Sequence, residues 1–346
     1  MIAPPLALPL ARPLALALAL LAACAVPVGA QLLVLPPPSA LAPELAPKLA
    51  QDPRGAPPAL FGQELEDPAT FGIGRVARDV AKELPSLDAM AVHLSDRIKD
   101  LGYARARPVI ARDDGEMIDF LRRGIVDLVS ETPLSALHFV HEAHASILLG
   151  EERQGHGEYR SVLFVRFESA IGKLEDLRAK RIVLEDTEST TSSLLPLAAL
   201  KQAGLQVAVL ENAQTSPPEQ SVGYYFTDSK SAIVAAVLDR SADAGALSDE
   251  DWRTLRRKEP GVAANLRLLY ESSSIPSGFL LASPTVSANQ REKLRAIFLS
   301  METDGPGRAM LDRYNRVNGF RPFNAALQKD IQRLEPTYLL VREEML

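Results

Sequence analysis

The sequence has one cysteine, one tryptophan and no excess of positive charge. A single cysteine excludes an internal disulfide framework and any zinc or iron–sulfur site built from several cysteines. Its 38 lysines and arginines face 44 aspartates and glutamates, for a net charge of −6. Non-specific nucleic-acid binding needs a basic surface, so this function is disfavoured. The sequence also contains neither a Gly-x-Ser-x-Gly turn nor a P-loop.

The first 30 residues are typical of an export signal. Residues 1–23 are almost wholly alanine, leucine and proline, and Arg12 is their only charged side chain. The longest apolar run after Pro13 has about ten residues, whereas a membrane-spanning helix needs about 20. A short apolar run followed by small residues is the pattern of a cleaved signal peptide. The sequence therefore predicts export to the periplasm.

Two cleavage sites remain open. Residues 21–24 resemble a bacterial lipobox, in which Cys24 would be lipidated and would anchor the protein to a membrane. Residues 28–30 instead fit the small-x-small rule of ordinary signal peptidase, which would leave a soluble periplasmic protein. A Pro- and Ala-rich segment follows over residues 31–69. We interpret it either as a stiff tether or as a leader without a function of its own.

Strand-like and helix-like segments alternate from residue 70 onward. This order predicts an α/β protein with mainly parallel sheets flanked by helices. Expected strands cover residues 71–74, 107–111, 126–129, 145–150, 159–167, 181–184, 206–210, 242–247, 266–270 and 278–281. Expected helices cover residues 86–102, 115–123, 132–144, 189–203, 229–238, 249–257 and 287–301, with a mostly helical C-terminus.

The alternation breaks into two lobes joined by two crossover segments. We expect the first lobe to begin with residues 70–170 and the second to cover residues 171–271. Residues 272–346 then return to the first lobe and end in the C-terminal helices. The crossings are expected near residues 168–178 and 271–276. Ligands of such open sheets bind at the carboxyl ends of strands, next to helix N-termini.

A dense run of hydroxyl side chains marks one such helix start. Ser189, Thr190, Thr191, Ser192 and Ser193 follow an expected strand. The first turn of a helix leaves backbone N–H groups unpaired and carries partial positive charge, so added hydroxyls suit a tetrahedral oxyanion. Ordinary N-capping by one residue is the alternative, but it needs only one hydroxyl.

Around this run the sequence resembles the periplasmic phosphate-, phosphite- and phosphonate-binding proteins of ABC transporters. The resemblance covers roughly residues 70–330. It rests on motifs in matching order and spacing: 124–129, 159–165, 169–186, Ser189-Thr190-Thr191-Ser192 with Pro196, 242–246, Ser274-Ile275-Pro276 and Gly319-Phe320. It implies a type II periplasmic binding protein fold, whose two lobes close around an oxyanion.

The resemblance also implies site residues. Ser189, Thr190, Thr191 and Ser192 would hold the anion from one lobe, and Thr132 from the other, although Thr132 could simply cap the helix that begins at Pro133. Lys230 stands where the family often has a histidine, and its fixed charge would strengthen the binding of phosphate. Arg75 falls in the loop where relatives place an aromatic residue and is a candidate bidentate ligand. Tyr159 could reach the cleft from a crossover.

Phosphonate binders hold the ligand amine with acidic residues at two positions, and one of the two is lost here. One of them is Gly278 in this sequence, and the other falls loosely near Glu250. Loss of an acidic partner disfavours an aminoalkylphosphonate as the ligand. Surface placement remains the alternative for Arg75 and Lys230, and core packing for Tyr159.

Three histidines three residues apart suggest a metal site at first sight. On a helix, His138, His141 and His144 drift by about 60° at each step, so two of them could share a face with Glu142 nearby, but not all three. No cysteine or other distant ligand completes a set. We therefore expect neither a metal nor a cofactor.

The sequence thus predicts a solute-binding protein that captures phosphate, phosphite or a small phosphonate for an ABC permease of the inner membrane. We expect a monomer with no enzymatic activity, because no nucleophile and base stand together. The alternative is an exported sensor or scaffold that has the same fold and a repurposed pocket. The sequence does not rank the oxyanions.

Overall fold

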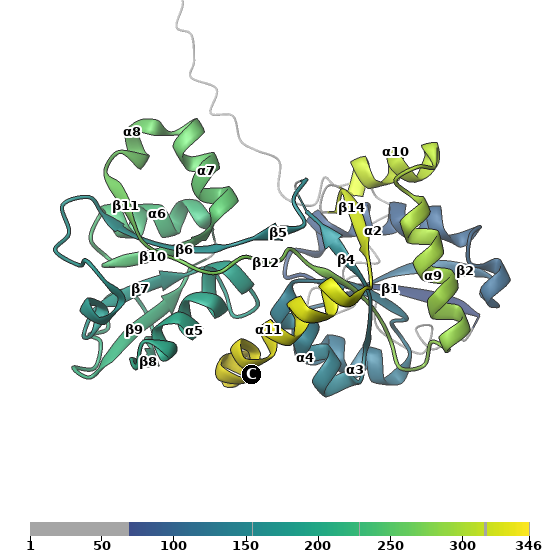
Figure 1. Cartoon of the computed structure of the whole chain (residues 1–346), viewed down its shortest axis with the longest axis horizontal. Coiled ribbons are helices and arrows are strands. Elements are labelled where there is room, and N and C mark those ends of the chain that lie inside the picture. Colours follow the sequence, from purple (N-terminus) through teal and green to yellow (C-terminus); the bar gives the residue numbers. More distant parts are fainter. Residues whose placement is uncertain (1–68, 154, 228, 315–316, 346) are drawn as a thin grey trace, which may run out of the picture. The chain divides into compact units, whose positions relative to one another are not determined.

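A computed structural model describes residues 69–153, 155–227, 229–314 and 317–345. The predicted export signal, Cys24 and all but the last residue of the Pro- and Ala-rich segment lie outside these residues. No helix within the described ranges is long and apolar enough to cross a membrane. The described chain forms two six-stranded sheets, each flanked by helices, and a two-stranded pair (Figure 1).

The first lobe is built on a mixed sheet in the order β14-β4-β13-β3-β1-β2. Its strands are β1 (Thr70–Val76), β2 (Arg105–Ala111), β3 (Leu128–Glu131), β4 (Ser146–Glu152), β13 (Phe279–Ala282) and β14 (Gly319–Pro322). Strand β1 runs parallel to β2 and β3, whereas β13 is antiparallel to β3 and β4. The later strands β13 and β14 therefore return the chain to this sheet.

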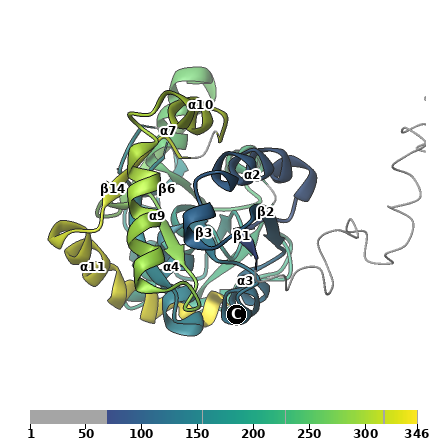
Figure 2. The same cartoon turned by 90° about the vertical axis from the view of Figure 1, so that its right-hand side faces the viewer.

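Helices cover both faces of this sheet (Figures 1 and 2). The helices are α2 (Val80–Ser95), α3 (Asp114–Arg123), α4 (Pro133–Ala143), α9 (Ala288–Ser300) and α10 (Gly305–Tyr314). Successive strand residues point to opposite faces, so Leu128 and Leu280 pack in the cluster of α2, α9 and α10. Val129 and Leu281 pack in the cluster of α3 and α4.

A buried carboxylate ties β1 to the turn that precedes β3. Asp127 accepts hydrogen bonds from the backbone N–H of Gly72 at 2.7 Å and from the hydroxyl of Tyr103 at 3.2 Å. Burial raises the pKa of Asp127 to about 6, although both hydrogen bonds oppose this shift. The carboxylate therefore joins β1 to the start of β3, away from the carboxyl strand ends that line the cavity described below.

Replacing this carboxylate gives a stability prediction. Asp127→Ala leaves a buried backbone N–H without a partner, so we expect the free energy of unfolding to fall by about 1–3 kcal/mol. Asp127→Asn keeps one acceptor oxygen and is expected to lose less. Urea denaturation followed by circular dichroism measures both variants. Equal stability of the wild type and Asp127→Ala would show that these hydrogen bonds contribute nothing.

The second lobe is built on a sheet in the order β11-β6-β10-β7-β9-β8. Its strands are β6 (Ser161–Arg166), β7 (Arg181–Leu184), β8 (Gln206–Val209), β9 (Ser221–Phe226), β10 (Ala244–Ser248) and β11 (Leu266–Glu271). Its helices are α5 (Leu195–Gln202), α6 (Lys230–Leu238), α7 (Asp249–Lys258) and α8 (Pro260–Ala263). Strands β10, β7, β9 and β8 are parallel, whereas β6 and β11 are antiparallel to their neighbours. The predicted α/β fold of two mainly parallel sheets flanked by helices is confirmed.

Two neighbouring segments, β5 (Glu158–Tyr159) and β12 (Ile275–Pro276), connect the lobes and pair antiparallel to each other. The first crossing thus precedes β6, so the expected crossing near 168–178 and the boundary at residue 170 lie too late in the chain. The physical reason is strand pairing: β6 bonds to β10 and β11, far along the chain, and local periodicity does not reveal those partners.

Helix α2 and strand β9 are among the elements that differ from the expected ones. Helix α2 begins at Val80, because Asp79 caps it by accepting the backbone N–H of Lys82 at 3.1 Å, and Pro85 lies inside it. Strand β9 was not expected, and it completes the parallel part of the second sheet.

The C-terminal helix α11 (Ala325–Val341) packs against α4 of the first lobe and α5 of the second. Tyr338 is buried and its hydroxyl lies 3.1 Å from Nδ1 of His138, while Glu335 lies 2.6 Å from Nε2 of His141. His144 ends α4 in the left-handed conformation, with φ of 57°. The first two histidines therefore serve packing between helices, and the third serves a helix end.

Candidate functional site

A cavity of 630 Å³ lies where the carboxyl ends of strands from both lobes meet the crossover segments. From the first lobe it is lined by the β1–α2 connection and by Glu131 and Thr132 at the end of β3. From the second it is lined by the segment after β7 and by the starts of α6 and α7. The crossover contributes Tyr159, among others. A cavity of this size at strand ends is the usual ligand site of an open α/β sheet.

Most of the expected site residues line this cavity. They are Thr132, Tyr159, Ser189, Thr190, Thr191 and Lys230. Arg75 and Ser192 are not among the lining residues. The structure thus brings together six side chains from positions 132 to 230, which come from both lobes and one crossover.

The hydroxyl run forms a π-helical turn, η6 (Thr190–Leu194), in front of α5. Ser189 caps this turn by accepting the backbone N–H of Ser192 at 3.2 Å, and its hydroxyl donates to Glu185 at 3.0 Å. Thr190 accepts the backbone N–H of Leu134 at 3.3 Å and so contacts the first turn of α4. Thr191 is buried and lines the cavity. Capping therefore accounts for the hydroxyl of Ser189, whereas Thr191 is a buried residue of the cavity lining.

Ser192 and Arg75 lie outside the cavity for different reasons. The hydroxyl of Ser192 is buried and makes no hydrogen bond with another described residue. Arg75 is 1% exposed, donates to Glu83 at 2.6 Å and stacks over the ring of Tyr314 at 4.5 Å. Strand alternation decides the second case, because Arg75 points from β1 towards α2 and α10 instead of towards the strand end. The position of Arg75 does not fit the expected role of a bidentate ligand.

Lys230 is the first residue of α6, at the cavity wall. Its ammonium lies 2.7 Å from Asp251 at the start of α7. Burial lowers the pKa of Lys230, but the carboxylates of Asp251, Glu185 and Asp186 outweigh it, so the net pKa is raised. Lys230 is therefore charged at neutral pH, and Asp251 already balances part of that charge.

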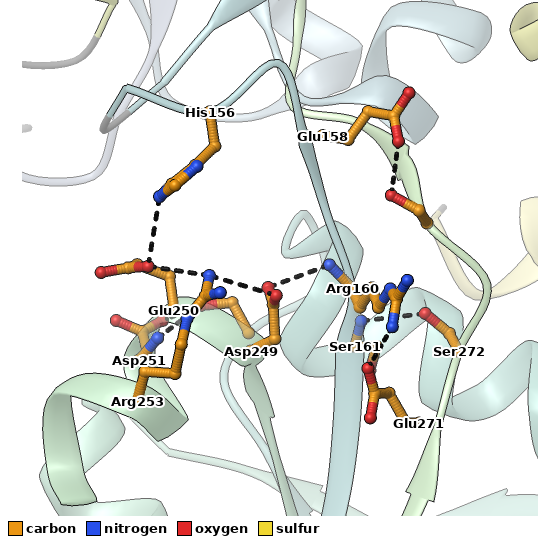
Figure 3. A network of polar contacts seen from close by, with 12 residues as sticks. His156, Glu158, Arg160, Ser161, Asp249, Glu250, Asp251, Arg253, Glu271 and Ser272 are labelled. Atoms are coloured by element: carbon orange, nitrogen blue, oxygen red, sulfur yellow. Dashed lines mark hydrogen bonds and ion pairs between the residues drawn. The ribbon is translucent and has the colours of Figure 1, made fainter.

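A network of polar contacts joins α7 to the crossover segments (Figure 3). Glu250 lies 3.8 Å from His156 and 2.9 Å from Arg253, which also lies 3.2 Å from Asp249. Asp249 in turn accepts the backbone N–H of Arg160 at 3.0 Å. His156, Glu250 and Arg253 all line the cavity, so this network forms its wall beside the crossovers.

Carboxylates outnumber cations around the cavity. The lining carboxylates are Asp79, Glu83, Glu131, Glu158, Glu185, Asp186, Glu188, Glu250 and Asp251. The lining lysines and arginines are Arg78, Lys82, Arg153, Lys230 and Arg253. An anion in this cavity would therefore face a wall with net negative charge. The protonation of these carboxylates would affect how well it binds.

Two of these carboxylates differ from the others in their surroundings. Glu131 is 4% exposed, and its oxygens accept the backbone N–H groups of Val76 at 3.2 Å and Thr132 at 3.1 Å. Burial raises the pKa of Glu188 to about 7, helped by neighbouring Asp186 and Glu131 and opposed by Arg78. Glu188 therefore changes its charge near neutral pH, directly beside the hydroxyl turn.

Several lining residues were not predicted from the sequence. Glu131, Arg153, His156 and Glu188 had not been singled out, although Glu188 directly precedes the hydroxyl run and could have been found there. Glu131 and Arg153 lie at the ends of strands β3 and β4, which is the signal that could have drawn attention to them. Within the described ranges, no group of three or more histidines, cysteines or carboxylates is arranged to hold a metal ion.

Comparison with known proteins identifies the family. Residues 81–327 match the family model of the ABC transporter, phosphonate, periplasmic substrate-binding protein. The phosphonates-binding periplasmic protein of Escherichia coli (strain K12) is 26% identical over 257 residues, which cover 73% of this chain and 71% of that protein.

Solved structures agree. XAC2383 from Xanthomonas citri, solved bound to chloride ion and bound to ATP, is 29% and 28% identical, with a TM-score of 0.75; each match covers 80% of this chain and 99% of that chain. PhnD1 from Prochlorococcus marinus (MIT 9301), in complex with methylphosphonate, shares the fold at 19% identity with a TM-score of 0.57, covering 80% of this chain and 98% of that chain. The chain therefore belongs to the family of non-enzymatic periplasmic substrate-binding proteins of phosphonate ABC transporters.

Proposed function

We propose that this protein captures a phosphonate, phosphite or phosphate in the periplasm and delivers it to an ABC permease of the inner membrane. The ligand binds reversibly in the cavity, and no bond is made or broken. Lobe movement about the two crossover segments encloses it, and the closed form is the one presented to the permease.

One observation carries the proposal: a turn of hydroxyl side chains at a helix start faces a cavity lined by both lobes. The Thr191 hydroxyl and the backbone N–H groups of the η6 turn supply neutral donors to oxyanion oxygens, and Lys230 supplies charge. Thr132 stands opposite on the first lobe, where its hydroxyl lies 3.5 Å from the carbonyl of Glu188. A ligand there would contact both lobes, and such contacts favour closure.

Calorimetric titration tests the proposal. The full chain is titrated with phosphate, phosphite, methylphosphonate and 2-aminoethylphosphonate, and we expect micromolar or tighter binding of at least one. Thr191→Ala removes a donor to a charged ligand, so we expect its affinity to fall about tenfold or more. Ser192→Ala is the matched control, because its hydroxyl lies in the same turn but outside the cavity.

Two outcomes contradict this proposal. A folded protein that binds none of the four anions favours a sensor or scaffold that has kept the fold and repurposed the cavity. Equal loss of affinity in Thr191→Ala and Ser192→Ala would show that the turn matters through its conformation and not through the Thr191 hydroxyl.

A larger phosphate ester is a second candidate ligand. The cavity of 630 Å³ falls in the range of sites that hold drug-sized molecules, of about 300–1,000 Å³, and a single methylphosphonate would leave much of it unfilled. The related XAC2383 has been solved with ATP. Titration with ATP beside the four small anions separates the two candidates. Tighter binding of ATP would favour a phosphate ester, and tighter binding of a small anion would favour the first proposal.

A further inference from the structure

A buried arginine at the cavity wall has no assigned role. Arg153 follows β4 and lies where the chain leaves the first sheet for the crossover β5. Its backbone exchanges two hydrogen bonds of 2.9 Å with His156, closing a turn that contains Gly155 with φ of 77°. These bonds fix the backbone of Arg153 at the start of the crossover segment.

A buried carboxylate holds one edge of its guanidinium. The Nε and Nη2 atoms donate to the same oxygen of Glu151 at 3.0 and 2.6 Å. Glu151 is fully buried, and Ser277 donates to its carbonyl oxygen at 2.9 Å. Burial lowers the pKa of Arg153, but the carboxylates of Glu151 and Glu131 outweigh it and the net pKa is raised. The guanidinium is thus a permanent and well-positioned cation.

Glycine at position 278 makes room for this cation. A Cβ at Gly278 would lie 2.5 Å from Nε and 2.6 Å from Cζ of Arg153, closer than real Cβ atoms come. The guanidinium therefore lies directly against the backbone of Gly278, the residue that precedes β13. Any side chain at position 278 would force it to move.

The opposite edge of the guanidinium is left for a ligand. Arg153 is 13% exposed and lines the cavity, and its Nη1 donates to no other described residue. Two other cations at the wall already form ion pairs within the protein. Lys230 pairs with Asp251, and Arg253 pairs with Asp249 and Glu250. A planar guanidinium offers two parallel N–H groups to a phosphonate or phosphate.

We propose that Arg153 is a ligand-binding residue of this cavity and a charged donor that attracts the oxyanion to a wall rich in carboxylates. This inference rests on the proposed function. Arg153 takes the role that the sequence had suggested for Arg75, which is buried against Glu83 and Tyr314. Because Arg153 lies at the start of the crossover, an anion bound to it could contact the crossover as well as both lobes.

Variants of the full chain test the assignment by calorimetry with methylphosphonate and phosphate. Arg153→Met alone would leave Glu151 buried and unpaired, so it is combined with Glu151→Gln. We expect the double variant to bind about tenfold more weakly or worse, with a shallower dependence on salt. Arg153→Lys, which keeps the charge but loses the fork, should lie between the double variant and the wild type.

Gly278→Ala provides an independent variant, because it displaces the guanidinium without removing its charge, and it should also weaken binding. Arg160→Met is the matched control: Arg160 pairs with Glu271 at 2.6 Å in the same crossover but does not line the cavity. A wild type that binds no oxyanion overturns the proposed function and this inference with it. Binding by the wild type that the folded double variant retains, with the same salt dependence, overturns the role of Arg153 alone.

Discussion

Glu83→Ala is expected to lower the free energy of unfolding by about 3–5 kcal/mol, because it leaves the buried guanidinium of Arg75 without its counter-charge. Arg75 is 1% exposed, so most of its guanidinium is shielded from water, whereas Glu83 is 24% exposed and lines the cavity. The Ser86 hydroxyl at 3.2 Å and the Tyr314 ring would remain in contact with it. Chemical denaturation followed by circular dichroism measures the loss.

Two comparisons make this result specific. Arg75→Met combined with Glu83→Gln removes both charges, and we expect it to be more stable than Glu83→Ala alone. Asp312→Ala breaks an exposed pair with Arg308, of 3.3 Å within α10, and should cost about 1 kcal/mol or less. A Glu83→Ala protein as stable as Asp312→Ala would mean that Arg75 is solvated after all.

Oxyanion binding is expected to weaken as the pH rises above about 7. Burial raises the pKa of Glu188 to about 7, so its carboxyl group is protonated below that pH and negative above it. Asp186, Glu131 and Asp113 face Glu188 with further negative charge, and Arg78 is the cation that opposes them. A ligand anion adds to this repulsion, so binding should take up a proton. The dissociation constant should then rise about tenfold per pH unit just above neutrality.

Glu188→Gln separates the protein's contribution from that of the ligand. Phosphate and phosphonate ionise near the same pH, but this effect is common to the variant and the wild type. We expect the variant to bind better than the wild type at pH 8 and to show a flatter pH profile. Calorimetry in buffers with different ionisation enthalpies counts the proton taken up. Identical pH profiles would exclude Glu188 as the titrating group.

Local sequence patterns predicted most elements of the fold. The strand at β1, the helix α3 ended by Gly124 and the hydroxyl turn before α5 each appear where spacing, a cap or a stop residue placed them. The crossover was placed too late because β6 is defined by partners that lie far along the chain. Strand β9 was missed although it lies between β7 and β8 in the second sheet.

The site shows the same division between local and distant information. Thr190, Thr191 and Lys230 could be chosen from sequence because each stands at a helix start, where a cap and an unpaired backbone are local properties. Arg75 was predicted to be a ligand, but its position does not fit that role. Its side chain lies on the face of β1 that α2 and α10 cover, and local sequence does not show which face that is. Arg153 was overlooked because its importance depends on Glu151 and on the missing side chain at Gly278.

The sequence by itself determined the class of fold, the acidic composition and the hydroxyl-rich helix start, since periodicity, charge and capping act over a few residues. Only the tertiary structure decided which cations reach the cavity and how many carboxylates surround it. Burial and charge pairing depend on atoms brought together from distant strands, as Arg75 with Tyr314 and Arg153 with Gly278 show. No local pattern encodes those distances.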